Sequence, residues 1–321
     1  MICPRTPTKI MCSVLRKEFK LAHFSLSHHS RDDFIFAQWQ WKHAVFQVYR
    51  VSIALYSSSF ILYILSTGMS NDMAYLTTWT YLVLTFYFLF SAFNAVFYTC
   101  RGHVRHQHES ESLAFAENRS GEHTYGCISN EEMSGSVNLQ KTNRSEISPS
   151  IDAHDNVNNG HIPSYLNQEG TSPTNHDVIT IPMKAAWFLG NTLQVFAIIV
   201  SLVYFIVLYP AIGHTSFWDI NLHGVNLFLV ITDTCISARP VRLLHLIHPL
   251  IYGMCYVIFS AIYWSFDHVN NVLYPGVLDW NYPGTTFIWI VALALVVAPL
   301  LQLIYFGAYR LRLNIYHRYI R

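Results

Sequence analysis

Six long apolar runs constrain the fold of this chain more than any other feature of its sequence. They span Val45–Thr67, Ala74–Thr99, Lys184–Tyr209, Leu222–Ser237, Leu243–Trp264 and Thr285–Tyr309. The hydrocarbon core of a bilayer is about 30 Å thick, and a helix needs about 20 residues to cross it. Every run qualifies as a membrane span, the fourth being the shortest. The sequence therefore predicts an all-α, polytopic membrane protein built as a six-helix bundle.

The positions of the lysine and arginine residues predict how this bundle is oriented. The connections at 66–73, 210–221 and 265–284 contain neither residue type, whereas the two tails, the segment between spans two and three, and the Arg239–Arg242 connection are basic. Cytoplasmic connections of membrane proteins carry the excess of Lys and Arg. We therefore expect both termini in the cytoplasm and the three arginine-free connections on the outer side.

The same pattern divides the chain into five parts. They are a cytoplasmic N-terminal tail (1–44), spans one and two (45–99), a cytoplasmic linker (100–183), spans three to six (184–309) and a cytoplasmic C-terminal tail (310–321). The linker is rich in Ser, Asn, His, Glu and Gly and has no sustained apolar periodicity. Because such a segment cannot bury enough apolar surface to offset the entropy of ordering it, we expect the linker to be disordered.

Composition excludes several classes of protein. Hydrophobic residues make up 52% of the chain and charged residues only 12%, which is too few charges for a soluble protein of this size. The sequence has no basic helix or aromatic face for nucleic acid, and its six cysteines avoid the expected outer connections, so no disulfide framework is predicted. We expect no cofactor and no metal site, and the bilayer is the one partner that composition implies.

Polar side chains inside a span are costly and therefore informative. In the fourth run His223, Asn226 and Asp233 recur at helical spacing on one stripe, which must face the interior of the bundle. Arg50, near the inner end of the first run, is the expected partner of Asp233, because pairing lowers the cost of burying either charge. The same predicted intramembrane cluster includes the other polar residues of the inner halves, namely Asn94, Asn191, Gln194, His245 and His248.

A second polar group is expected at the outer end of the bundle. Thr77 lies near the outer end of the second run, at a depth similar to that of His223 and Asn226 in the fourth. A threonine hydroxyl becomes a nucleophile when a neighbouring base, usually histidine, takes its proton. A Thr77–His223 couple would supply that chemistry. The alternative is that these residues only form interhelical hydrogen bonds, worth about 0.6 kcal/mol each.

Several segments resemble the rolling stone family of membrane proteins. They are Glu18–His29, Gln38–Gln40, Tyr75–Trp79, His223–Asp233, Pro240–His245 and Leu273–Trp280. The resemblance implies a multi-pass plasma-membrane protein that acts in cell-surface interaction or in myoblast-type cell fusion, with no protein partner or chemical mechanism specified. Span length alone fits the plasma membrane and the endoplasmic reticulum equally, because tilt absorbs the mismatch.

A more distant resemblance links the chain to the androgen-induced family of membrane hydrolases. That family cleaves esters of fatty acids with hydroxy fatty acids by means of an intramembrane threonine, which Thr77 matches, and a histidine that ends a His-Gly-x-His pattern. Here the pattern reads His-Gly-Val-Asn, which puts Asn226 at the catalytic position. Asparagine cannot act as a general base near neutral pH. The sequence therefore favours a protein that is not an enzyme, with a lipid-ester hydrolase using Thr77 and His223, or Asn226, as the alternative.

Overall fold

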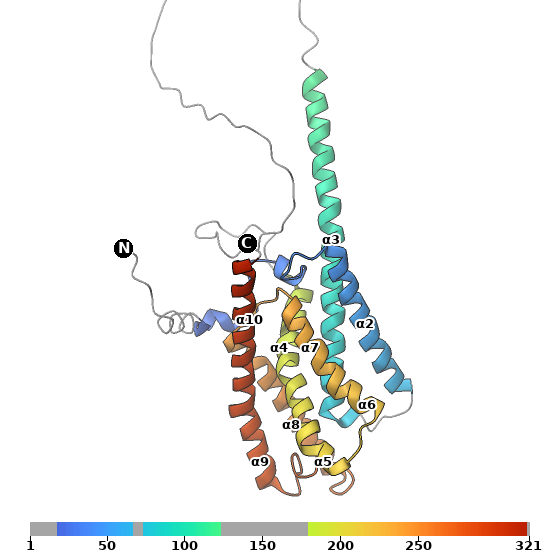
Figure 1. Cartoon of the computed structure of the whole chain (residues 1–321), viewed down its shortest axis with the longest axis vertical. Helices are drawn as coiled ribbons and strands as arrows, with labels where there is room; N and C mark the ends of the chain where they lie inside the picture. The colour runs from blue at the N-terminus through green and yellow to red at the C-terminus, as the bar shows by residue number, and fades with distance from the viewer. Residues whose placement is uncertain (1–17, 67–72, 123–178, 320–321) are drawn as a thin grey trace, which may run out of the picture. The chain divides into compact units, whose positions relative to one another are not determined.

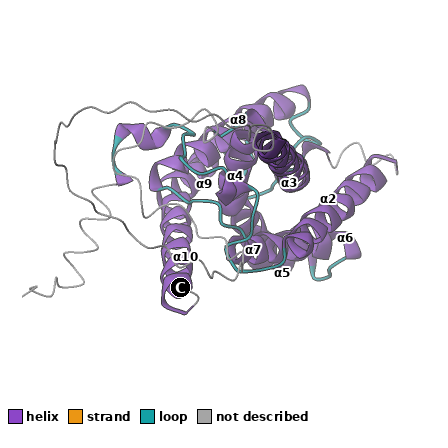
Figure 2. Cartoon of the chain, turned by 90° about the horizontal axis from the view of Figure 1, so that it is seen from above, coloured by secondary structure: helices purple, strands orange, loops and turns teal. Residues whose placement is uncertain are grey.

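In the computed structural model, residues 18–66, 73–122 and 179–319 are described, with main chain only for 101–122. Every regular element in these ranges is helical, and they contain no β-strand (Figure 2). By contact the chain forms two units. Residues Met1–Thr99 and Pro163–Arg321 make up the first, and Cys100–Ile162 the second. The prediction of an all-α protein is confirmed.

The long helices of the first unit follow the predicted apolar runs (Figure 1). The first two are α2 (His43–Ser66) and α3, which begins at Leu76. The third is α4 (Ile181–Leu202), which continues as the π-helix η4 (Val203–Leu208) and α5 (Tyr209–Ile212). The last two are η6 (Leu243–Leu246) with α8 (Ile247–Phe266), and α9 (Pro283–Ala292) with the π-helix η7 (Leu293–Val297) and α10 (Ala298–Tyr319). These five are long and apolar enough to cross a membrane.

The fourth predicted run is also one continuous helix, but a more polar one. It consists of α6 (Phe217–Asp219), the π-helix η5 (Ile220–Val225) and α7 (Asn226–Ile236). At about 1.5 Å per residue it reaches about 30 Å, which is enough to cross a bilayer. It falls outside the set of apolar spans because its inward stripe is polar. The described part of the chain thus carries the six predicted helices, five of them strongly apolar.

The segment between α3 and α4 differs in part from its predicted disorder. Helix α3 does not end at the expected membrane boundary but continues to Glu122. Residues 101–122 include four Glu and three Arg, which favour helix, and extending an existing helix avoids the unfavourable nucleation step. Residues 123–178, which hold the rest of the predicted linker, lie outside the described residues.

Helix α4 occupies the centre of the first unit. Of its most apolar stretch 61% is buried, against 22% for η6–α8 and 17% for α9–α10. The largest core cluster joins α4 to α2, α3 and α7, with Tyr81, Leu84, Phe88 and Leu193 fully or almost fully buried. The N-terminal segment is attached to α4, because Phe34 packs on the buried ring of Trp187. The outer helices α8 and α9–α10 therefore expose most of their surface to the lipid in which such spans lie.

The two ends of the first unit collect different connections. At one end, which we call the loop end, the Leu76 N–H donates to the Tyr274 hydroxyl at 2.9 Å, and the Tyr256 hydroxyl donates to the Ala74 carbonyl at 2.9 Å. The opposite end, which we call the arginine end, contains the Arg239–Arg242 connection. There the Arg312 guanidinium donates a hydrogen bond to the Thr234 carbonyl at 2.5 Å. The arginine-free and basic connections thus gather separately, as the sequence pattern requires of an oriented bundle.

Candidate functional site

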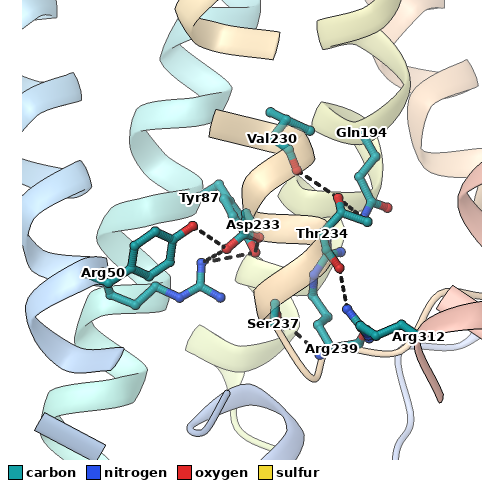
Figure 3. Close-up of polar contacts among 10 residues, drawn as sticks. Arg50, Tyr87, Gln194, Val230, Asp233, Thr234, Ser237, Arg239 and Arg312 are labelled. Carbon is teal, nitrogen blue, oxygen red and sulfur yellow. Dashed lines mark hydrogen bonds and ion pairs between the residues drawn. The ribbon is translucent and has the colours of Figure 1, made fainter. Parts of the chain in front are cut away.

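A buried ion pair joins the first and fourth predicted spans. Arg50 on α2 and Asp233 on α7 are both 3% exposed and form a salt bridge (Figure 3). The Tyr87 hydroxyl on α3 donates to the second oxygen of Asp233 at 2.5 Å, and Tyr49 donates to the first at 3.5 Å. Paired and hydrogen-bonded in this way, neither charge is left isolated in a low-dielectric interior. The structure brings Arg50 and Asp233 together as the helical spacing suggested.

The neighbours of this pair differ from those expected. The sequence suggested a ring of amides, but tyrosines surround the pair instead, and the guanidinium of Arg50 also lies 4.9 Å from the centre of the Phe46 ring. The predicted amides of spans two and three make other contacts. Asn94 donates to the Pro182 carbonyl at 3.3 Å, and Gln194 donates to the Thr234 hydroxyl at 3.3 Å. An aromatic cage holds a guanidinium through its ring faces, which hydropathy patterns do not reveal.

The remaining predicted polar residues form a separate group around Asn191 on α4. The Asn191 side-chain nitrogen lies 2.9 Å from Nδ1 of His245 and 3.2 Å from Nδ1 of His248. Its oxygen accepts a hydrogen bond from Arg239 at 3.2 Å. No group of three or more metal-ligating side chains occurs among the described residues. We interpret this group as a structural link that fixes α8 and the Arg239–Arg242 connection to α4.

Two buried arginines in this region were not among the predicted site residues. Arg239 and Arg312 are 5% and 6% exposed, and Arg312 donates to the carbonyls of Thr234 and Arg239 (Figure 3). The guanidinium of Arg239 lies flat against α4 at Gly190, where an added Cβ would be only 2.5 Å away. A glycine within an apolar helix was the one sequence signal of this close approach.

A cavity of about 340 Å³ lies among α3, α4, η5, α8 and the α9–α10 helix. Its wall is mainly aliphatic and aromatic, with Phe196, Leu250 and Leu293 among the lining residues. A few lining residues carry a hydroxyl or imidazole group, and these are Thr77, His223, Tyr256 and Tyr274. An apolar cavity with a few convergent polar groups is the usual form of a site for a small ligand.

All three π-helical segments of the described chain contribute to this wall. Val203 and Leu208 belong to η4, His223 to η5, and Leu293 to η7. A π-helical turn widens a helix locally and is rare outside functional sites. The coincidence of three such turns around one cavity therefore marks it as the candidate functional site.

The structure separates two predicted catalytic alternatives. Thr77 and His223 both line the cavity, although 146 residues part them in the chain. Asn226 does not line it, is 0% exposed, and donates its amide to the Leu222 carbonyl at 3.3 Å. A helix-stabilising bond of this kind is a structural role. Of the two residues considered as a base, only His223 has access to the cavity.

Thr77 is positioned by the loop that follows α8. It lies in the first turn of α3, and Tyr274 from the loop is hydrogen-bonded both to the Leu76 N–H and to the Thr77 side chain. Burial raises the pKa of Tyr274 above its ordinary value, so the phenol stays protonated near neutral pH. The contact between Tyr274 and α3 joins residues 198 positions apart, so periodicity along the chain does not predict it.

His223 is held by its π-helical turn and by one aromatic neighbour. Its carbonyl accepts a hydrogen bond from the Ser201 hydroxyl on α4 at 2.7 Å, and its ring stacks on Tyr204 at 3.9 Å and 11°. Its Nδ1 atom is buried without a hydrogen-bond partner of good geometry among the described residues. Because buried polar atoms are normally satisfied, a buried imidazole nitrogen without a hydrogen bond of good geometry is unusual.

The helical fold and its apolar spans define a class, the all-α polytopic membrane proteins. Within that class the family model described as "Protein rolling stone" matches residues 165–320. A curated protein from Drosophila melanogaster, "Protein rolling stone", is 29% identical over 137 residues, covering 40% of this chain and 49% of the relative. Over these residues the chain is similar to the rolling stone family.

The family match contains some of the residues of the ion pair and of the cavity, and not others. The chain spans about half the length of the curated relative it matches. The family match contains His223, Asp233 and Tyr274 but not Arg50 or Thr77, which precede it. No solved structure matches the chain.

Proposed function

We propose that this protein is a membrane-embedded hydrolase of lipid esters, with Thr77 as nucleophile and His223 as general base. The observation that carries the proposal is their shared position on the wall of one apolar cavity. The hydrogen bond from the Leu76 N–H to Tyr274, at the start of α3, and the unsatisfied Nδ1 of His223 support it further. The apolar wall favours a substrate with a long hydrocarbon chain, and esters of fatty acids with hydroxy fatty acids fit that description.

The proposed reaction follows the general scheme of nucleophilic acyl transfer. The Thr77 hydroxyl oxygen attacks the ester carbonyl while His223 takes the hydroxyl proton. The tetrahedral intermediate then expels the alcohol, which leaves with that proton, and an acyl-threonine remains. Water, activated by His223 in turn, attacks the acyl group and releases the fatty acid, so both original side chains are regenerated.

The test is hydrolysis by the purified full chain in detergent micelles. A fluorogenic fatty-acid ester and an ester of a hydroxy fatty acid are the probes, and released fatty acid is measured. We expect turnover by the unaltered protein and loss of turnover in Thr77→Ala and in His223→Ala. Asn226→Ala should retain turnover if it folds, since that side chain does not reach the cavity. Turnover that persists in Thr77→Ala, or none in the unaltered folded protein, overturns the proposal.

A second candidate function comes from the similarity to the rolling stone family. Rolling stone proteins are associated with cell-surface interaction and myoblast-type fusion, and we propose that this chain acts at the plasma membrane with both termini in the cytoplasm. The specific observation in its favour is the family match over the last four predicted spans. Deleting the protein from fusion-competent cells should then reduce fusion, and Thr77→Ala should restore it as well as the unaltered chain does. Restoration only by the unaltered chain would make hydrolysis part of the cellular role.

A further inference from the structure

We propose that the cavity takes up a single acyl chain sideways from the bilayer, through an opening between α8 and η7. The expected position of the lipid's polar end rests on the proposed function, whereas the entry route does not. Two large apolar residues that line the cavity are also exposed, and they come from different helices: Met254 on α8 is 58% exposed, and Leu295 on η7 is 69% exposed. An exposed side chain that also lines a cavity marks where that cavity reaches the surface.

The surface at this opening is the part of the protein that faces lipid. Helices α8 and α9–α10 are the least buried of the five apolar spans, and α4 behind them is the most buried. In a bilayer, the surroundings of Met254 and Leu295 are hydrocarbon chains rather than water. An occupant that enters there must itself be apolar along its length, which fits an acyl chain.

The loop end of the cavity is closed instead. Leu273 and Val277, from the loop after α8, are 8% and 6% exposed, and Val277 lines the cavity. The loop is tied to α9, because the Thr286 hydroxyl donates to the Asp279 carbonyl at 2.6 Å and the Trp289 indole donates to the Gly276 carbonyl at 2.9 Å. These bonds hold the loop against α9 at the loop end of the cavity, whereas the exposed lining residues lie on α8 and η7 and favour a lateral route.

The length and polarity of the cavity define the orientation of the lipid. Along α8 the lining runs from Pro249 to Val257, which is about 12 Å of helix and comparable to half of a hydrocarbon core of about 30 Å. The lining residues Thr77, Tyr256 and Tyr274 belong to the loop end, where Tyr274 and Tyr256 are hydrogen-bonded to the main chain of Leu76 and Ala74. The acyl chain therefore comes from the leaflet at the loop end, with its polar end at Thr77 and its methyl end toward the midplane.

Photolabelling tests this route independently of hydrolysis. The full chain carrying Thr77→Ala is reconstituted in phospholipid vesicles with a long-chain fatty acid bearing a diazirine in its chain, and the labelled residues are identified by mass spectrometry. We expect labelling of lining residues such as Leu250 and Leu293. Ala294→Trp, which puts a bulky ring at the opening, should reduce that labelling severalfold. The matched control is Val291→Trp, at a lipid-facing position of α9 outside the lining, and should leave it unchanged.

The outcomes separate this inference from the proposed function. Labelling of the lining that is insensitive to Ala294→Trp, or labelling confined to lipid-facing positions such as Val291, overturns the lateral route even if esters are hydrolysed. Labelling that depends on residue 294, without any ester hydrolysis, supports the lateral route and refutes the proposed hydrolase function. If Ala294→Trp does not fold, Ala294→Leu provides a smaller obstruction, and labelling of the lining should then be lower than in the protein with Ala294 unaltered.

Discussion

The charge of Arg50 inside the bundle depends on one carboxylate, that of Asp233. Asp233→Asn keeps the size of the side chain but leaves a buried guanidinium without its counter-ion. Breaking a buried pair in this way typically destabilises a protein by about 3–5 kcal/mol. We predict a large fall in the unfolding temperature of the purified protein in detergent and poor delivery to the cell surface. The double variant Arg50→Met with Asp233→Leu should recover most of that loss, and unaltered unfolding of the single variant would contradict the account.

The close approach of Arg239 to α4 gives a second prediction at a single residue. In Gly190→Ala the new Cβ would lie 2.5 Å from the guanidinium of Arg239, which must then move and lose its hydrogen bond to Asn191. Overpacking of this kind costs about 1–3 kcal/mol, so we predict a lower unfolding temperature. Gly307→Ala on α10 is the matched control, because an added Cβ there meets nothing within 4 Å. Equal behaviour of the two variants would refute the proposed packing.

At this scale the sequence predicted the pairs that follow from helix periodicity and not those that depend on tertiary approach. The polar stripe of the fourth run identified Asp233, and the scarcity of charge in spans identified Arg50 as its partner. Tyr87 and Arg239 were missed, since a tyrosine in a span and an arginine in a connection are both ordinary in sequence. Their roles arise only when α3, α4 and α7 come together.

Among the elements, the start of α3 connects the fold to the proposed chemistry. Tyr274→Phe removes the hydroxyl that binds the Leu76 N–H and Thr77. Loss of such a bond destabilises by about 1 kcal/mol, and a less restrained Thr77 should react more slowly. We predict a small drop in unfolding temperature and a lower kcat, with KM almost unchanged because the cavity wall keeps its shape.

Tyr282→Phe is the matched control for this variant, because Tyr282 lies in the same connection but is 68% exposed. It should leave kcat, KM and the unfolding temperature as they are. A purely structural Tyr274 would shift the unfolding temperature while leaving kcat unchanged, and that result would remove it from the proposed site.

Element boundaries show where sequence reasoning met its limit. The six apolar runs predicted the six helices, because a span must satisfy its own backbone hydrogen bonds. The three π-helical turns could not be foreseen, since they reflect local packing and not composition. They shape the cavity, so the site that contains Thr77 and His223 was predictable only as two residues at a similar depth.

For the whole molecule, the separation of basic and arginine-free connections predicts a single orientation in the membrane. The sequons at Asn118 and Asn143 lie in the segment expected in the cytoplasm, so neither should receive a glycan in cells. A glycosylation acceptor introduced in the 265–284 connection should be modified and serves as the positive control. The measurement is the electrophoretic shift upon treatment with a glycosidase. A glycan at Asn118 or Asn143 would show that the protein has the opposite orientation in the membrane.

The account depends most on Thr77 and His223 acting together across one apolar cavity. An alkyl fluorophosphonate, which reacts with activated hydroxyl groups, tests that claim directly in the folded full chain. Mass spectrometry should locate the adduct on Thr77, and His223→Ala should abolish it while leaving the unfolding temperature within the range of the other folded variants. An unmodified Thr77 in the folded protein, or an adduct that forms equally well without His223, would contradict the account.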